Sequence, residues 1–593
     1  MKKIFTVFMF IIAITLLING HQIGYAQGPI GESCSNGIQW EYEKGSFYLF
    51  NYASLINKLN NNDSMLCVVG VYNKENNQLL KCQMKEINSS YNQKAVELSC
   101  NTDNLSEYKI KFLFWKTTME PLCDSETFDI LNVSPTCLNG GYQSVYSYST
   151  GNKSIYNAVP ALGHSFGEDE IIKEAGIVEC GYKIHACTGC GFKDKFTYYK
   201  DTEMARLCMY GDLTGIGKKS EVPITVSFKG EGKQFENYAL LKYQGHTSLV
   251  YDKKNFTLKL FKNEERTDKN KIVFRDWKKE HKYILKANYV DPSVCRNLVS
   301  ADIWSEMVAC REGHSERLDK CSNYGATDGF PISLYLNDEF IGLYTMTLHR
   351  DDDLFDMDDD VMDAIAVTNT NHYDESRFKA PATFTETSDW EVEFNGLPDD
   401  TWVEDKVNRF IDFVRTSSDE EFKTNLSTYM DVNSAIDYLI AIYSLGITEN
   451  GSKNMTLASY SDGPWIMSLC DMECAFGLKD TGGEYYSPEY FLPVYNGSDL
   501  SSATDSLLWD RILNNFKDEL KLRYFELRET FLTPERIIEK AKKFTSVIND
   551  EFYKADEKLY PDMPQLDISA ITQIEEYVTE RFTLLDEAFL GID

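Results

Sequence analysis

The order of two hydrophobic patterns along the 593 residues constrains the fold most strongly. Up to about residue 348, short runs rich in β-branched and aromatic residues alternate with turn residues, which is typical of strands. After about residue 400, apolar residues recur at helical spacing. A chain in which strands precede helices is predicted to be α+β, and we expect the strand-rich and helical halves of the C-terminal region to form two lobes.

Several elements are predicted individually. Strands are expected over residues 222–228, 238–243, 256–261, 282–287, 331–336 and 341–348, the last two joined by a hairpin turn. A helix is expected where Val403, Val407, Phe410, Ile411 and Val414 share one face. Thr533 followed by Pro534 has the pattern of an N-cap and a first helical residue, so another helix should begin there.

The N-terminus predicts secretion. Lys2 and Lys3 precede an apolar stretch, residues 4–18, and Ala26 closes a cleavage-site pattern, so residues 1–26 are expected to be a signal peptide. The alternative is a membrane anchor, although the stretch is shorter than the about 20 residues of a typical span. Ten Asn-x-Ser/Thr sequons fit a secreted glycoprotein: Asn62, Asn88, Asn104, Asn132, Asn152, Asn255, Asn425, Asn450, Asn454 and Asn496.

The formal charge of −32 excludes some classes of partner. A surface this acidic repels phosphate backbones and anionic lipid, so we expect neither nucleic-acid binding nor stable membrane insertion. A phosphate-bearing small molecule can still bind in a local basic or metal-lined pocket.

Residues 27–150 are predicted to form a β-rich module closed by disulfides. Strand-like runs cover residues 65–72 and 108–115. Secreted modules with an even number of cysteines usually pair them, so up to three disulfides are expected, with their pairing left open. The six cysteines are Cys34, Cys67, Cys82, Cys100, Cys123 and Cys137.

A small Cys/His segment follows, within residues 158–200. It contains His164 in a GHSFG run, then Cys180, then Cys187 and Cys190 in a CTGCG run, and it resembles a short repeat of bacterial surface proteins. Three cysteines and a histidine can bind zinc tetrahedrally, so a structural Zn²⁺ at Cys180, Cys187 and Cys190 is one interpretation. A disulfide-linked β-hairpin is the other.

Three sequence blocks in residues 205–593 carry the functional signal. The first is YQGHTS at 243–248 with KKNFTLKL at 253–260; the second is NYVDPSVCRN at 288–297 with SLYLNDEFIGLY at 333–344; the third is KNM at 453–455 with DMECAFG at 471–477. In this order they resemble the spore-coat protein H (CotH) kinase family. The resemblance implies an atypical, two-lobed protein-kinase-like domain that phosphorylates secreted or coat proteins.

The resemblance also implies site residues. Phosphoryl transfer needs a metal on the phosphates, a lysine to hold them and a carboxylate to orient the acceptor hydroxyl. Asp471 and Asn454 are the expected ligands of Mg²⁺ or Mn²⁺. Lys286 is expected to hold the ATP phosphates, with Asp302 or Glu306 as its helix partner.

Other residues compete with this set or complete it. Lys259 is a second candidate for the phosphate lysine. Gly245 and Ser248 lie in a hydroxyl-rich turn that would cover the phosphates. Glu449 stands five residues before Asn454, where the family has an aspartate, and is the expected hydroxyl-orienting carboxylate.

The expected function is therefore a secreted atypical protein kinase that transfers the γ-phosphate of ATP to Ser/Thr hydroxyls of extracellular, coat or matrix proteins. Two alternatives stay open. The longer side chain of Glu449 is compatible with a weakly active or inactive surface adhesin that keeps the fold. Transfer of another group, such as adenylyl, is also compatible, since a fold does not fix which phosphorus is attacked.

Overall fold

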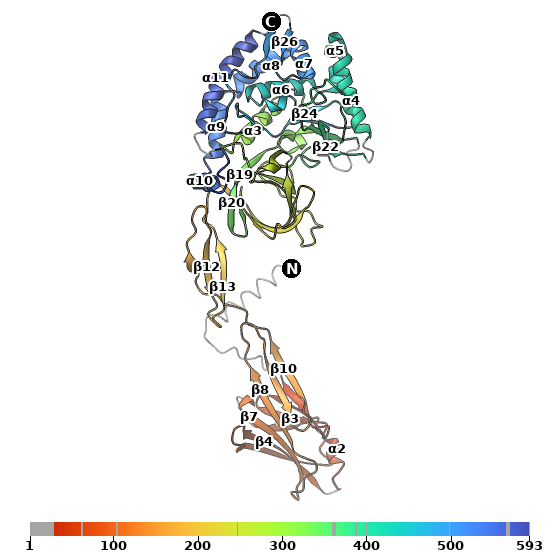
Figure 1. Ribbon diagram of the computed structural model, residues 1–593. Helices are drawn as coiled ribbons and strands as arrows, with labels where there is room; N and C mark the ends of the chain where they lie inside the picture. Colours follow the sequence, from red (N-terminus) through yellow and green to blue (C-terminus); the bar gives the residue numbers. More distant parts are fainter. Residues whose placement is uncertain are drawn as a thin grey trace. The chain divides into compact units, whose positions relative to one another are not determined.

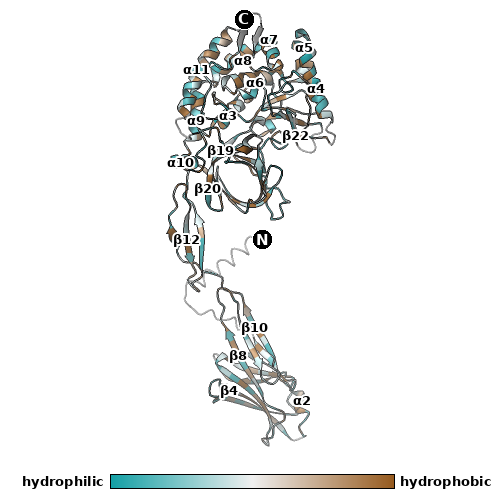
Figure 2. Ribbon diagram, in the orientation of Figure 1, coloured by the Kyte–Doolittle hydropathy of each residue, from teal (hydrophilic) through white to brown (hydrophobic). Residues whose placement is uncertain are grey.

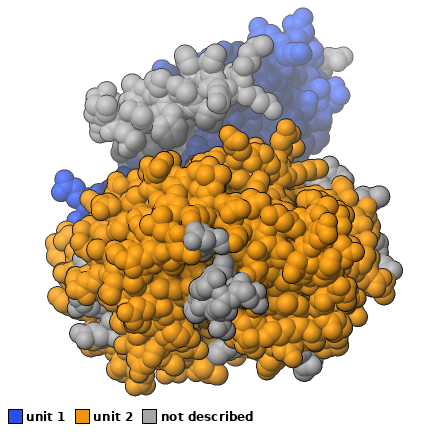
Figure 3. Space-filling model, turned by 90° about the horizontal axis from the view of Figure 1, so that it is seen from above, with its two compact units in different colours: residues 1–170, 183–196 blue, residues 171–182, 197–593 orange. Residues whose placement is uncertain are grey.

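The computed structural model describes residues 29–593, except 61–62, 102–104, 246, 358–362, 386–387, 398–400, 497–498, 565–569 and 592–593. The predicted signal peptide lies outside the described residues. The chain divides into two compact units, drawn in two colours in Figure 3. Unit 1 comprises residues 1–170 and 183–196, and unit 2 comprises residues 171–182 and 197–593.

Unit 1 contains a β-sandwich; the strand-like runs predicted a β-rich module but not its division into two sheets. One sheet has the order β1(Ile30–Ser33)-β2(Gln39–Glu43)-β3(Ser46–Phe50)-β6(Val96–Ser99). The other has the order β10(Lys153–Val159)-β9(Gly141–Ser147)-β8(Glu126–Val133)-β7(Tyr108–Lys116)-β4(Ser64–Asn73)-β5(Leu79–Asn88). Trp40 of the first sheet packs against Phe112 and Phe128 of the second, with ring centroids 5.5 and 5.1 Å away, so the sheets share one core. Short helical turns lie at α2(Ala53–Ile56) and η1(Leu105–Glu107).

The expected disulfides are not formed in this structure, because all fifteen cysteines are free. Cys34 and Cys67 lie in the apolar core of the sandwich, and burial raises the pKa of Cys67 to about 12, with Cys123 adding to the rise and Lys85 opposing it. These two side chains pack as small hydrophobic groups. Cys137, counted with this module from the sequence, belongs to a different cluster described below.

A three-stranded sheet follows the sandwich, in the order β11(Glu170–Lys173)-β12(Gly181–Ala186)-β13(Lys193–Tyr198). The predicted boundary at residue 150 falls between β9 and β10, which pair with each other.

Unit 2 contains a closed barrel, seen nearly end-on in Figure 1. Its order is β14(Ala205–Tyr210)-β15(Val222–Gly230)-β16(Lys233–Gln244)-β17(Asn255–Phe261)-β18(Lys282–Lys286)-β20(Glu339–Leu348)-β19(Gly329–Leu336). Every strand predicted in this region is present. The closure was not predicted, because it depends on β14 pairing in parallel with β19, far along the chain.

A four-stranded sheet lies between the barrel core and the helical core. Its order is β22(Trp390–Asn395)-β21(Ile365–Asn369)-β23(Met455–Ser459)-β24(Ile466–Leu469). Side chains alternate across a strand, so Ile365 and Val367 of β21 join the helical core while Ala364 and Ala366 join the barrel core. The sheet thus contributes one face to each core.

Several of the helices are amphipathic. The longer ones are α3(Arg296–Ala309), α4(Thr401–Thr416), α5(Asp419–Tyr429), α6(Val432–Ser444), α7(Leu507–Asn515), α8(Lys517–Thr530), α9(Pro534–Thr545), α10(Asp550–Leu559) and α11(Ala570–Leu590). Figure 2 shows hydrophilic and hydrophobic residues mixed along α9 and α11. The predicted N-cap is confirmed, since the Thr533 hydroxyl accepts a hydrogen bond from the Arg536 N–H at 3.2 Å. All five apolar residues of the predicted face of α4 are buried.

The remaining elements are short. They are the 3₁₀ turns η2(Thr247–Val250), η3(Leu318–Lys320), η4(Ser322–Gly325) and η5(Glu449–Gly451), and the hairpin β25(Val494–Asn496)-β26(Asp499–Ser501). The mixed α and β composition is confirmed, and the kinase-like arrangement of two lobes stays a prediction. In the part of the chain that the structure describes, no helix combines the length and apolar character needed to cross a bilayer.

Candidate phosphoryl-transfer site

The candidate site lies where strands of the barrel and of the four-stranded sheet end. Lys286 is the last residue of β18, Asn454 precedes β23, and Asp471 follows β24. Strands β23 and β24 run antiparallel with Met455 opposite Leu469, so the start of β23 lies beside the end of β24. Asn454 and Asp471, 17 positions apart in sequence, are therefore brought to the same end of these two strands.

Lys286 forms an ion pair with Asp471 and a second one with Glu473, at 3.3 Å between Nζ and Oε2. The lysine side chain is 14% exposed and that of Asp471 is 41% exposed, so the aspartate faces solvent. Burial alone would raise the pKa of Asp471 and lower that of Lys286, but their mutual attraction outweighs it and moves both pKa values the other way. Both groups are held in their charged forms.

Glu473 has the opposite electrostatic environment. Burial raises its pKa to about 7, with Asp471 and Glu449 adding to the rise and Lys286 opposing it. Three carboxylates thus act on one another at this edge, with Lys286 among them. A divalent cation bound by oxygen ligands would relieve that repulsion, so the donor set fits Mg²⁺ or Mn²⁺.

Asn454 and Asp471 both have left-handed backbones, with φ of +59° and +54°. Asparagine and aspartate tolerate this conformation better than other side chains. Asn369 fixes the turn before β23: its Nδ2 donates to the Ser452 carbonyl at 3.0 Å, and its Oδ1 accepts from the Met455 N–H at 2.7 Å. The Asn454 N–H donates to the Asn369 carbonyl at 2.9 Å, so one buried residue positions the whole turn.

Glu449 begins the turn η5 and contacts two basic side chains. Lys453 Nζ lies 3.2 Å from its Oε1, and His372 Nε2 lies 4.0 Å from the same atom. Burial acts to raise the pKa of Glu449, but His372 and Lys453 outweigh it and lower the pKa. A charged Glu449 beside Asp471 is the form that accepts a proton or orients a hydroxyl.

The DPSVCRN run of the second block has a structural role. Asp291 and Arg296 form a fully buried ion pair, and Arg296 Nη1 donates to the Ala475 carbonyl at 2.7 Å. Asn297 Oδ1 accepts from the Met472 N–H at 2.6 Å. The second block therefore holds the loop that carries Asp471 and Glu473 from both sides.

A sequence model of the family described as CotH kinase protein matches residues 241–585. The chain belongs to the CotH kinase family. No curated protein matches the chain. The matched range contains all the residues predicted for the phosphoryl-transfer site, and it begins near the end of β16.

Within the CotH kinase region, the turn with Gly245 and Ser248 is tied to the end of β18. Asn255 Nδ2 donates to Ser248 Oγ at 3.2 Å, and Asn255 Oδ1 accepts from the Ala287 N–H at 2.7 Å. Gly245 has a φ of +105°, and a Cβ there would lie 2.0 Å from Ser248 Oγ. Only glycine at position 245 lets the Ser248 hydroxyl lie this close to the backbone.

Lys259 Nζ pairs with Glu221 at 2.6 Å, and its role as a phosphate lysine stays a prediction. One expectation about partners is wrong. Asp302 and Glu306 do not pair with Lys286; both bind Lys540 of α9, at 2.9 and 2.8 Å. The lysine of the site instead takes its acidic partners from the DMECAFG loop.

Sequence reasoning did not assign roles to Glu473, Lys453, His372 or Asn369. Glu473 carried a signal, since it is the second acid of the DMECAFG run. His372 and Asn369 carried none, because they reach the site only through the pairing of β21 with β23.

Proposed function

We propose that the protein is a secreted, metal-dependent protein kinase that transfers the γ-phosphate of ATP to Ser/Thr hydroxyls of extracellular, coat or matrix proteins. Membership of the CotH kinase family supports kinase-like chemistry. The observation that carries the proposal is the ion pair of Lys286 with Asp471 and Glu473, beside Glu449. Lysine, metal-binding carboxylate and hydroxyl-orienting carboxylate are the set that phosphoryl transfer needs.

Each side chain has a role in this proposal. Asp471 and Asn454 hold the divalent ion, with Glu473 as an additional oxygen donor. When bound, that ion neutralises phosphate charge. Lys286 exchanges its carboxylate contacts for phosphate oxygens, and the turn with Gly245 and Ser248 covers them.

Glu449 acts on the acceptor. Its carboxylate orients the Ser/Thr hydroxyl and accepts its proton, while Lys453 and His372 keep it charged. Secretion is proposed from residues 1–26 and the sequons, and secreted proteins are the proposed substrates. Because Asn454 is only 8% exposed, we propose that its sequon carries no glycan.

The test is transfer of γ-labelled phosphate by the purified secreted chain, to itself and to acceptor proteins, with Mg²⁺ or Mn²⁺. Asp471→Asn should remove transfer and the metal-dependent thermal shift by ATP, and Asp268→Asn, at an exposed ion pair with Lys262, is the matched control. Mass spectrometry separates phosphate from adenylyl, since the additions differ (about 80 Da against about 329 Da). Wild-type protein that binds ATP yet modifies no acceptor would contradict the proposal.

The second candidate is a binding protein that keeps this fold without catalysis. The ion pair of Glu449 with Lys453, at 3.2 Å, favours it, because a carboxylate already held by an ammonium is less available to a hydroxyl. In that case neither the wild type nor Glu449→Asp would transfer phosphate, while both would fold.

A further inference from the structure

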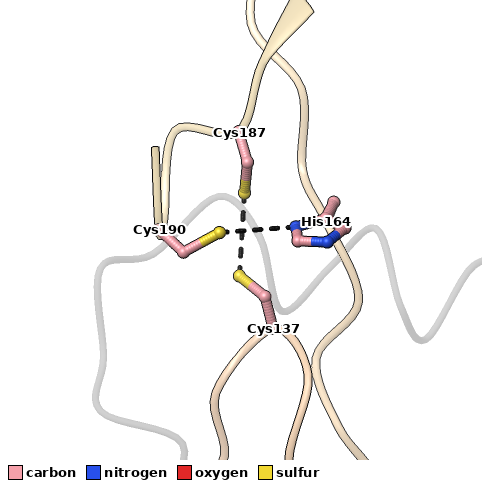
Figure 4. A group of neighbouring side chains, drawn as sticks. All are labelled: Cys137, His164, Cys187 and Cys190. Atoms are coloured by element: carbon pink, nitrogen blue, oxygen red, sulfur yellow. Dashed lines mark hydrogen bonds between the residues drawn. The ribbon is translucent and has the colours of Figure 1, made fainter. Parts of the chain in front are cut away.

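Four side chains from three separate segments of unit 1 converge on one point (Figure 4). Cys137 lies between β8 and β9, His164 follows β10, and Cys187 and Cys190 lie in the turn between β12 and β13. The ligand atoms, three sulfurs and one imidazole nitrogen, all lie within 4.8 Å of one another. Figure 4 shows the four side chains pointing toward a common centre.

The distances match a metal tetrahedron and not a disulfide. Cys137 Sγ lies 3.6 Å from Cys187 Sγ, and Cys190 Sγ lies 3.4 Å from His164 Nδ1. With Zn–S of about 2.3 Å and Zn–N of about 2.05 Å, tetrahedral geometry gives edges of about 3.8 Å for sulfur to sulfur and about 3.6 Å for sulfur to nitrogen. A disulfide would bring two sulfurs to about 2.05 Å.

The backbone holds the ligands in place without help from the cluster. The turn is closed by the Cys187 N–H donating to the Phe192 carbonyl at 2.7 Å and the Gly191 N–H donating to the Cys187 carbonyl at 2.8 Å. The Gly163 N–H donates to the Cys137 carbonyl at 3.1 Å, which ties His164 to Cys137. The His164 ring stacks on Phe192 with centroids 4.5 Å apart.

A further bond joins the histidine segment to the Cys-x-x-Cys turn. The Thr188 N–H and hydroxyl both donate to the Ser165 carbonyl, at 2.9 and 3.0 Å. Gly189 faces the cluster, since a Cβ there would lie 3.3 Å from Cys137 Sγ. A small residue in this turn leaves room for the sulfur of the distant segment.

We propose that Cys137, His164, Cys187 and Cys190 bind one Zn²⁺ in a closed, structural site. Four protein ligands fill the tetrahedron, which is the arrangement of structural and not catalytic zinc. Each thiol gives its proton to solvent as its sulfur binds the ion. The site links the β8–β9 loop to the β12–β13 turn within unit 1.

This set corrects the one expected from sequence, in which Cys180 was a ligand. Cys180 Sγ instead lies 3.4 Å from the Asp338 carbonyl oxygen in unit 2. Its place is taken by Cys137, 27 residues before His164, which sequence alone grouped with the N-terminal module.

The experiment measures zinc in the purified full chain, prepared under reducing conditions with excess Mg²⁺ so that oxygen-ligand sites bind no zinc. The wild type should hold about one zinc per chain, the occupancy of a single closed site. In Cys137→Ser and Cys190→Ser the zinc content per chain should fall at least about 10-fold. Cys180→Ser should keep it, and so should Cys82→Ser, at an exposed free cysteine.

A second readout keeps the proposal testable if a variant misfolds. Wild-type protein loaded with Co²⁺ should show the thiolate charge-transfer and intense d–d bands of a tetrahedral site. The proposal would be overturned if the reduced wild type, supplied with zinc, held no more zinc than a buffer blank. Full zinc in Cys137→Ser, or a Cys137–Cys187 disulfide in the chain as secreted, would also overturn it.

Discussion

Two lysine–aspartate pairs in unit 2 have the same chemistry and opposite surroundings. Lys253 and Asp556 are both 0% exposed, and Lys253 Nζ lies 2.6 Å from Asp556 Oδ2 and 2.7 Å from the Leu343 carbonyl. Lys286 and Asp471 are 14% and 41% exposed. Lys253 belongs to the first family-like block and Lys286 lies two residues before the second, yet only the Lys286–Asp471 pair lies among further carboxylates.

The pKa shifts of the two pairs run in opposite directions. In the first pair burial dominates, lowering the pKa of Lys253 and raising that of Asp556 against their attraction. In the second pair attraction dominates, so the pKa of Lys286 rises and that of Asp471 falls. We call Lys253–Asp556 the closed pair and Lys286–Asp471 the open pair. The closed pair supports the fold, whereas the lysine of the open pair, surrounded by surplus negative charge, can exchange its carboxylate partner for a ligand.

The largest effect is expected from breaking the closed pair. Asp556→Asn would leave the Lys253 ammonium buried without its counter-charge, which should lower the free energy of unfolding by about 3–5 kcal/mol. Urea unfolding of the variant measures it. Replacing both partners, as Lys253→Met with Asp556→Leu, should recover most of the loss. An unchanged midpoint in Asp556→Asn would show that this pair does not support the fold.

Breaking the open pair should change chemistry and leave stability nearly unaffected. Asp471→Asn removes a metal ligand and should lower the rate of phosphate transfer by at least about 1000-fold, since metal charge stabilisation is worth several kcal/mol. Its unfolding midpoint should stay close to the wild type, because Lys286 keeps Glu473. If the urea midpoint of Asp471→Asn falls as far as that of Asp556→Asn, the open pair supports the fold as much as the closed pair does, which contradicts this prediction.

Glu449 tests the acceptor side of the open pair. Glu449→Gln keeps the shape and removes the charge, so transfer should fall by about 100-fold while ATP-dependent thermal shift persists. Glu449→Asp should retain or raise transfer, because it restores the shorter carboxylate that the family resemblance implies. Single-turnover transfer at saturating ATP separates these effects from binding. Full activity in Glu449→Gln would remove this residue from the mechanism.

The residues of the open pair were singled out from sequence, although their pairing was not predicted. Lys286, Asn454, Asp471 and Glu449 were chosen because each lies in or close to a short family-like block, and the register of β23 with β24 brings Asn454 and Asp471 together. Their roles stay predictions. The pairing of Lys253 with Asp556 joins residues 303 positions apart. No local pattern predicts a contact over that distance.

The same limit explains the other errors. Cys137 and His164 belong to different β connections, so spacing could not assign them to one cluster. Asp302 and Glu306 were placed on a helix correctly, but which helix would pack against their face was not encoded locally. Element types follow from local periodicity, whereas partners depend on how strands and helices far apart in the chain come together.

The smallest effect is expected at Glu280, a buried acid whose pKa is set mainly by burial. Glu280 is 3% exposed and accepts a hydrogen bond from the Ser322 hydroxyl at 2.8 Å. Burial raises its pKa from 4.5 to about 7, with Ser322 opposing the rise and Asp353 and Asp351 adding to it.

A folded-state pKa above the unfolded value means that the native state binds more protons between about pH 4.5 and pH 7, so Glu280 makes stability fall as pH rises through that window. Glu280→Gln should keep the hydrogen bond and remove this fall. The variant should therefore gain stability over the wild type on going from pH 5 to pH 8, by on the order of 1–3 kcal/mol. Urea midpoints at the two pH values measure the difference. The control is Glu264→Gln, at an exposed glutamate in the connection between β17 and β18. If Glu280→Gln and the wild type show the same pH dependence, Glu280 is already charged in the native protein, and burial does not dominate its pKa as it does in the closed pair.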